Sequence, residues 1–111
     1  MPAAPAAESV FGAIACETRR TLLDALARRE MSVSDLVGVA GVSQPAVSQH
    51  LKVLRDAGLV DERRRGRFRI YRLDARPLAE VMRWVTVYER FWSRRLTALG
   101  RVLDEMEGDG T

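Results

Sequence analysis

The sequence predicts a mainly helical fold with one small β-hairpin, in the order α-α-α-α-β-β-α, which is a winged helix-turn-helix. Three observations support this prediction. A short helical pattern over residues 34–40 reaches Gly41, and a longer helical pattern follows from Ser43. An arginine-rich segment around Gly66 comes directly afterwards. Finally, a long and largely apolar helix is predicted over residues 76–107, close to the end of the chain.

The second helix of the pair has one apolar side and one polar side. Ser43 suits the N-cap because its hydroxyl can accept a hydrogen bond from a first-turn amide, and Pro45 needs no helical amide partner there. Apolar residues recur at helical spacing and form the inner stripe: Val47, Leu51 and Leu54. The outward side carries Pro45, Gln49, Lys52 and Asp56, with Gln44 and Ser48 on one flank. Gly58 ends the helix, which we assign to residues 43–57.

The segment after this helix is expected to form a β-hairpin over residues 59–73. Glycine tolerates positive φ, so Gly66 is the predicted turn residue. Residues 62–72 form the arginine-rich part, which we call the wing. The apolar members of the hairpin are Val60, Phe68, Ile70, Tyr71 and Leu73.

Positive charge is concentrated on this helix and hairpin. The formal net charge is +3, yet residues 43–73 hold eight basic against three acidic side chains, whereas the flanking segments are each slightly acidic. A localised basic surface indicates a polyanionic partner, here double-stranded DNA. The candidate contacts of the wing are its arginines: Arg63, Arg64, Arg65, Arg67 and Arg69. The alternative is an ordinary helical hairpin, followed by a charged β-hairpin, whose outer faces are only solvated.

The polar side chains of the second helix have the chemistry to contact DNA. Gln44 and Gln49 can each form two parallel hydrogen bonds with an adenine edge, and one of them could instead contact a phosphate or solvent. Ser48 can contact a base or a phosphate, and Lys52 is better suited to a phosphate. His50 lies nearer the core side, where a packing or capping role is as reasonable as a phosphate contact.

The remaining helices are expected to cover the core and to meet a second copy of the chain. Short helices are predicted over residues 8–16 and 18–29, with a brief strand at residues 31–33. The last helix is apolar around most of its first half, which is more than one core requires. We therefore expect a homodimer through the first and last helices. The interface residues are expected to be Val10, Phe11, Ile14, Trp84, Tyr88, Phe91, Trp92, Leu96, Leu99 and Leu103. Part of this aromatic set could equally be plain core packing.

Length and composition favour a single cytoplasmic domain over residues 8–107, with disordered tails at residues 1–7 and 108–111. A length of 111 residues allows one core. A single cysteine excludes an internal disulfide framework. We find no signal-peptide pattern and no apolar run long enough to cross a membrane. One His and one Cys far apart, without a glycine-rich phosphate loop, provide no catalytic arrangement, so we do not expect an enzyme.

With these elements placed, the chain resembles the ArsR/SmtB family of bacterial winged-helix transcriptional repressors over about residues 9–106. The resemblance is carried by residues 15–19, by residues 33–36, by the segment VSQPAVSQHLKVL at residues 42–54, and by AGLV at residues 57–60 with the arginine wing and Tyr71. It implies that residues 43–57 are a recognition helix in the DNA major groove, with Gln44, Pro45, Ser48 and Gln49 facing the DNA. The wing would then reach flanking phosphates or the minor groove.

The chain departs from the family pattern at the metal-binding positions. Ser32-Val33-Ser34 stands where metal-sensing members often carry Cys-Val-Cys, and serine is a poor ligand for soft metals. The last helix has no histidine, and only Cys16 and His50 remain as candidate ligands. We therefore expect a member that binds no metal and no cofactor. Cys16 is either a small buried residue at a helix junction or a thiol switch.

Two functional alternatives to a simple repressor stay open. The aromatic last helix could line a pocket for an unknown small-molecule effector, which would make the protein an effector-responsive or redox-responsive regulator. A winged-helix module that binds protein rather than DNA is the other alternative, although it would be expected to carry a degraded basic wing.

Overall fold

The computed structural model describes residues 9–91 of the chain. It divides the chain into two compact units, with the boundary between Val81 and Met82. The first unit contains α1 (Val10–Ile14), α2 (Glu17–Leu26), β1 (Met31–Ser32), α3 (Val33–Ala40), α4 (Gln44–Asp56), β2 (Val60–Arg65) and β3 (Phe68–Leu73). The last helix, α5 (Leu78–Thr86), runs across the boundary. The predicted winged helix-turn-helix is confirmed, with β1 as a third strand of its sheet.

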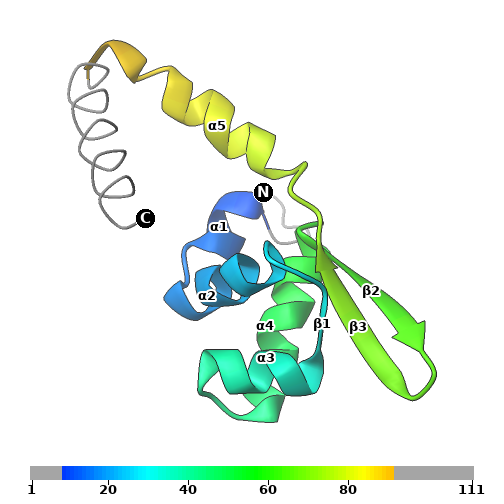
Figure 1. Cartoon of the computed structure of the whole chain (residues 1–111). Coiled ribbons are helices and arrows are strands. Elements are labelled where there is room, and N and C mark those ends of the chain that lie inside the picture. The colour runs from blue at the N-terminus through cyan, green and yellow to red at the C-terminus, as the bar shows by residue number, and fades with distance from the viewer. Residues whose placement is uncertain (1–8, 92–111) are drawn as a thin grey trace, which may run out of the picture. The chain divides into compact units, whose positions relative to one another are not determined.

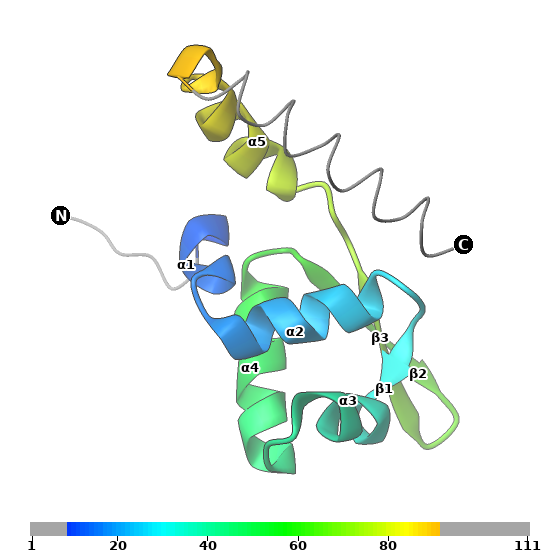
Figure 2. The ribbon, with the colours of Figure 1, turned by 60° about the vertical axis from the view of Figure 1, so that its left-hand side comes forward.

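The helix-turn-helix consists of α3 and α4, joined by a tight turn (Figure 2). A capping box begins α3, since Ser32 Oγ accepts from the amide of Asp35 and the Asp35 carboxylate accepts from the amide of Ser32. Gly41 ends α3 at a φ of 68°, which is unfavourable for residues with a Cβ. Ser43 is the N-cap of α4 as predicted, and its Oγ accepts from the amide of Ala46 at 3.3 Å.

The core of the first unit is an apolar cluster to which the helices and the sheet all contribute. The largest fully buried side chains are Leu22, Leu36, Val47, Leu51, Leu54 and Leu59. The predicted inner stripe of the second helix is therefore confirmed. Each such side chain contributes about 1.5–3 kcal/mol to stability, so the stripe holds α4 firmly against α1, α2 and α3.

The sheet is antiparallel in the order β1-β3-β2. Its β2–β3 hairpin extends away from the helices (Figure 1). At the base of the hairpin, Val60 and Tyr71 are buried, whereas the residues around the turn at Gly66 are exposed. Gly66 has a φ of 64°, in agreement with its predicted role as the turn residue. Only the base of the wing is thus anchored in the core.

The structure corrects the prediction of one continuous last helix over residues 76–107. Within the described residues, α5 ends at Thr86, a turn follows at residues 87–88, and helical residues resume at Glu89. Thr86 Oγ1 donates to the carbonyl of Met82 at 2.7 Å, a contact that tends to bend helices. The β-branched run Val85-Thr86-Val87 also disfavours a regular helix. The predicted part beyond Phe91 lies outside the described residues.

The first two helices are shorter than predicted. Ser9 is the N-cap of α1, which ends at Ile14, and Cys16 is the N-cap of α2. The junction between them is held by arginines of α2, because Arg19 Nε donates to the carbonyl of Ala13 at 2.7 Å and Arg20 Nη1 to that of Ile14 at 2.7 Å. Among residues 9–91, no helix is long and apolar enough to cross a membrane.

Candidate nucleic-acid interface

The side of α4 that the helical spacing predicted to face outward is exposed. Ser43, Gln44, Pro45, Ser48, Gln49 and Lys52 all lie on the surface. Two of these side chains already have partners within the chain. The Ser43 hydroxyl caps the helix, and Lys52 Nζ lies 3.5 Å from Asp56 Oδ2 one turn further along. Gln44, Ser48 and Gln49 are left to present their amide and hydroxyl groups to a partner.

A groove of about 260 Å³ joins the recognition helix to the wing. It is lined by the start of α3 (Ser32, Val33 and Ser34), by Gln44 and Ser48 of α4, and by Arg67, Phe68 and Arg69 at the tip of the hairpin. The structure therefore brings together residues about twenty positions apart in the sequence. Amide, hydroxyl and guanidinium groups around one groove are the donors that protein surfaces offer to DNA phosphates and base edges.

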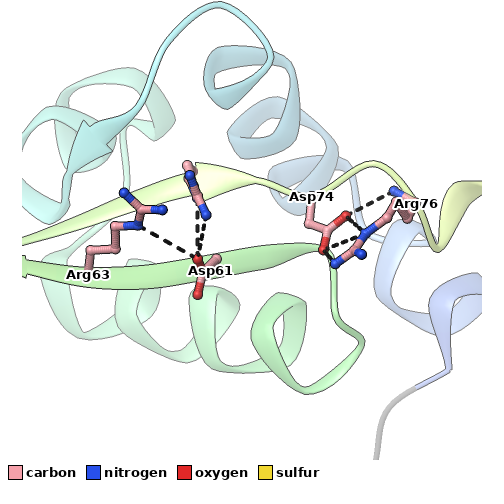
Figure 3. Close-up of polar contacts among 5 residues, drawn as sticks. Asp61, Arg63, Asp74 and Arg76 are labelled. Atoms are coloured by element: carbon pink, nitrogen blue, oxygen red, sulfur yellow. Dashed lines mark hydrogen bonds and ion pairs between the residues drawn. The ribbon is translucent and has the colours of Figure 1, made fainter.

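The five wing arginines are not equivalent. Arg65 pairs with Glu30 at 3.1 Å, Arg69 with Glu62 at 3.4 Å, and Arg63 lies 4.0 Å from Asp61 (Figure 3). Arg64 and Arg67, in contrast, have no carboxylate partner among residues 9–91, and both are exposed. These two side chains carry the positive charge of the wing that is least compensated by nearby acidic groups.

Two acidic residues hold arginines at the base of the hairpin, away from its tip. Asp61 pairs with Arg72 at 3.2 Å as well as with Arg63. Asp74 accepts hydrogen bonds from the Arg76 side chain, among them Nε to Oδ1 at 2.9 Å and Nη2 to Oδ2 at 2.7 Å, and another from the Arg76 amide at 3.1 Å (Figure 3). These hydrogen bonds lower the pKa of the Asp74 carboxyl to about 2. Arginines at the base of the hairpin are thus already paired with carboxylates before any partner binds.

His50 has a packing role within the described chain. Its Nδ1 lies 3.3 Å from Arg19 Nη1, and the same guanidinium reaches the carbonyls of Gly12 and Ala13. The side chain therefore ties α4 to the α1–α2 junction. Of the two roles left open by the sequence, this geometry favours packing over a phosphate contact.

Sequence reasoning missed three residues at this surface. Phe68 was expected among the apolar members of the hairpin, yet its side chain is 61% exposed and lines the groove beside Gln44 and Ser48. Ser34 lines the same groove from α3. Glu62 pairs with arginines of both α4 and β3. Strand alternation relative to the buried Tyr71 would have placed Phe68 outward, whereas the sequence carries no signal for the other two contacts.

The residues predicted to form the dimer interface differ in how far they are exposed. Val10 is buried in the core of its own chain and is not available to a partner, while Phe11 is 38% exposed and Ile14 packs partly against the core.

In the second unit, Tyr88 lies 5.4 Å from Trp84 and 6.4 Å from Phe91, measured between ring centroids. Trp84, Val85, Tyr88 and Phe91 line an apolar hollow of about 360 Å³. The predicted contacts Trp92, Leu96, Leu99 and Leu103 lie outside the described residues.

Comparisons with known proteins place this geometry in a family. Residues 16–62 match the family described as "Bacterial regulatory protein, arsR family". The chain is 44% identical over 104 residues to the HTH-type transcriptional regulator Rv2034 of Mycobacterium tuberculosis, covering 94% of each chain. The chain belongs to the ArsR family. The transcriptional repressor SdpR of Bacillus subtilis is 34% identical, covering 69% of this chain and 86% of its own length.

A crystal structure of an ArsR family transcriptional regulator supports the same assignment. It superposes with a TM-score of 0.66 at 29% identity and covers 75% of this chain and 86% of its own. ArsR family members are DNA-binding transcriptional regulators, so the protein is a regulator and not an enzyme. The family match spans α2 to the middle of β2 and includes the whole helix-turn-helix.

The surroundings of Cys16 change the pKa of its thiol. The amide of Arg19, in the first turn of α2, lowers the pKa of the Cys16 thiol, and partial burial opposes this effect. The thiol is half-buried at the start of the helix, more accessible than the buried junction residue expected from the sequence. Within residues 9–91, no group of three or more His, Cys, Asp or Glu side chains could hold a metal ion.

Proposed function

We propose that the protein is a homodimeric, sequence-specific transcriptional repressor that binds an inverted-repeat operator and senses no metal. One observation carries this proposal. Gln44 and Ser48 of the recognition helix line the same groove as Arg67 and Arg69 of the wing. A single DNA duplex could therefore contact the hydrogen-bonding side chains and the guanidinium groups together.

The recognition helix, residues 43–57, would read base edges in the major groove. Gln49 is exposed on the side of α4 opposite the buried Val47, Leu51 and Leu54, and Gln44 lies at the first turn. A glutamine amide matches the N6 and N7 positions of adenine. Ser48 would contact a base or a phosphate. Lys52 would contact a phosphate and give up its ion pair with Asp56.

The wing, residues 62–72, would contact the DNA backbone beside the recognition helix. We assign this role first to Arg64 and Arg67, which have no acidic partner among the described residues. Arg69 comes second, because it lines the groove but its Nε is paired with Glu62. Arg63 and Arg65 would have to give up ion pairs before binding. Exposed ion pairs contribute only about 0–1 kcal/mol, so this exchange is feasible but makes these two contacts weaker.

Dimerisation would place two recognition helices about 34 Å apart, which is the spacing of successive major grooves on one side of B-DNA. The exposed apolar side chains of the second unit support self-association, since Trp84, Tyr88 and Phe91 are 55%, 43% and 66% exposed in the single chain. Among the predicted first-helix contacts, Phe11 and Ile14 remain candidates, and Val10 does not.

We propose that the protein senses no metal because other residues stand where metal-sensing family members carry their metal ligands. Ser32 and Ser34 stand at the family's thiolate positions, and Ser32 Oγ is engaged in the capping box of α3. A structural or regulatory zinc site needs about four Cys, His or carboxylate ligands. Cys16 and His50 amount to two of these ligands, and the Nδ1 of His50 lies 3.3 Å from Arg19 Nη1.

A gel mobility-shift assay with footprinting tests the proposal. The probe is the DNA upstream of the gene that encodes this chain, with a scrambled duplex of the same composition as control. We expect a protected inverted repeat with half-sites about 10 bp apart, and binding that is unchanged by a metal chelator. Equal affinity for both duplexes would contradict sequence-specific repression, and loss of binding with chelator would contradict the metal-independent assignment.

A further inference from the structure

Glu62 is the residue through which the recognition helix and the wing contact each other by ion pairs. It lies on β2, and its carboxylate is 21% exposed. Oε1 lies 2.8 Å from Arg55 Nη1, in the last turn of α4, and Oε2 lies 3.4 Å from Arg69 Nε on β3. One carboxylate therefore contacts two guanidinium groups that come from different elements.

The position of Glu62 along the hairpin is as informative as its contacts. On the inner side of β2, Val60 is buried, Glu62 is half-buried and Arg64 is exposed. The register pairs Glu62 with Tyr71, which is 5% exposed, and pairs Arg64 with Arg69, which is exposed. Glu62 is therefore the last partly buried residue on the inner side of β2 before the hairpin leaves the core.

We propose that Glu62 is a positioning residue that determines specificity, because its ion pair with Arg55 fixes the wing relative to the recognition helix while its ion pair with Arg69 joins the two strands of the wing. This inference rests on the proposed function. Three strand residues (63–65) lie between Glu62 and Gly66. The four residue steps span about 13 Å, so a tilt of about 20° at Glu62 would move the wing tip by about 4.5 Å. Such a shift would separate the arginines of the wing from Gln44 and Ser48 across the groove.

An acidic residue beside a DNA-binding surface could also act by its charge alone. A purely electrostatic role would reduce affinity for all duplexes alike, because phosphate attraction does not depend on sequence. A positioning role depends instead on the length of the side chain. Asp retains the charge of Glu but is one methylene shorter, so the variant Glu62→Asp changes the reach of the carboxylate and keeps the net charge constant.

Asp61→Glu provides a matched control. Asp61 is the neighbouring residue on the opposite side of β2, and it pairs with Arg63 and Arg72 of the hairpin itself. This variant also keeps the net charge and changes the side chain by one methylene, but it alters no contact with α4. Both variants are compared with the wild-type chain at equal folded fraction, measured by circular dichroism.

The decisive measurement is the ratio of affinity for a duplex selected by the wild-type protein to affinity for a scrambled duplex, over a series of salt concentrations. We expect Glu62→Asp to lower this ratio by about fivefold to tenfold, comparable to one mismatched base pair. The phosphate contacts of the wing fix the register in which the recognition helix meets the bases of the selected duplex. Affinity for scrambled DNA should stay unchanged, because a displaced wing keeps its arginines and can still reach phosphates there in another register. Asp61→Glu should leave the ratio within twofold. A ratio for Glu62→Asp that stays within twofold of wild type overturns the proposal.

Amide hydrogen exchange of residues 62–69 without DNA separates this proposal from the proposed function. Faster exchange in Glu62→Asp than in Asp61→Glu would support a positioning role for Glu62, and equal exchange in the two variants would contradict it. A wild-type protein with no preference between duplexes would refute the repressor assignment, and the exchange result would then decide the positioning role alone.

Discussion

At the scale of single residues, the surface combines side chains that can read bases with side chains that can only attract phosphate. Gln49 is a neutral amide on the exposed side of α4, and Arg67 is a guanidinium at the tip of the wing without a carboxylate partner in the described chain. Hydrogen bonds to base edges distinguish sequences, whereas phosphate contacts add affinity to every sequence. Substitutions at these two residues should therefore have different signatures.

Gln49→Ala should reduce affinity for the operator by about 1–3 kcal/mol and relax specificity at one base pair, because two hydrogen bonds to an adenine edge are lost. Competition binding with duplexes substituted at each position measures both effects. Unchanged discrimination at every base pair would show that Gln49 does not read a base.

Arg67→Ala should weaken binding to operator and scrambled DNA by the same factor. The slope of log affinity against log salt should become shallower by about one unit, since one phosphate contact is removed. Titrations at four or more salt concentrations check this expectation. A loss confined to the operator would instead make Arg67 a base-reading residue.

Tyr71 provides a prediction about pH at the same scale. Burial, followed by the nearby Glu62 carboxylate, raises the pKa of Tyr71 in the folded chain above that of the unfolded chain, which is about 10. The stabilising contribution is fully present below pH 10 and is lost as the pH rises through the folded pKa, because the unfolded state deprotonates first. Tyr71→Phe should therefore show a smaller loss of unfolding free energy than the wild-type chain between pH 9 and 11 in urea titrations, and an equal loss would contradict this role of Tyr71.

At the scale of elements, the bounds of the recognition helix could be predicted from sequence. The end of α5, the pairing of β1 and the ion pairs of Glu62 could not. Ser43, Pro45 and the spacing of Val47, Leu51 and Leu54 are local signals, and α4 begins and ends within a residue or two of the predicted positions. The turn after Thr86 results from a side-chain hydrogen bond within an otherwise helical pattern. The pairing of β1 with β3 is a long-range contact, and the ion pairs of Glu62 join different elements, so a periodicity reveals neither.

Ser43→Ala should destabilise the helix-turn-helix, because the Ser43 hydroxyl caps α4 through the amide of Ala46. Loss of a serine N-cap costs about 1 kcal/mol, so the midpoint of urea unfolding should fall without a change in the slope. Ser34→Ala, at an exposed position within α3, is the control. Equal midpoints for the two variants would contradict the capping role.

At the scale of the whole molecule, the proposed repressor requires two copies of the surface. The sequence indicated self-association from the apolar last helix, and the exposed aromatic side chains Trp84, Tyr88 and Phe91 of the second unit fit that expectation. Because Val10 is buried within its own chain, the first helix could contribute fewer contacts than the sequence suggested. The proposed interface also includes Trp92, Leu96, Leu99 and Leu103, which lie outside the described residues.

Sedimentation equilibrium tests the dimer directly. The wild-type chain should sediment as a dimer at micromolar concentration, and Phe91→Ser should shift the equilibrium toward monomer because it removes an exposed aromatic side chain from the proposed interface. Glu80→Ser, an exposed position near the start of α5, is the control. A wild-type monomer at micromolar concentration would exclude the two-fold arrangement.

The central claim is that the recognition helix and the wing form one DNA-binding surface, and amide chemical-shift mapping on addition of the footprinted duplex tests it most directly. The largest perturbations should cluster at residues 43–52 and 63–69, with Ser34 beside them. Perturbations that cluster on α2 and leave both segments unchanged would contradict it.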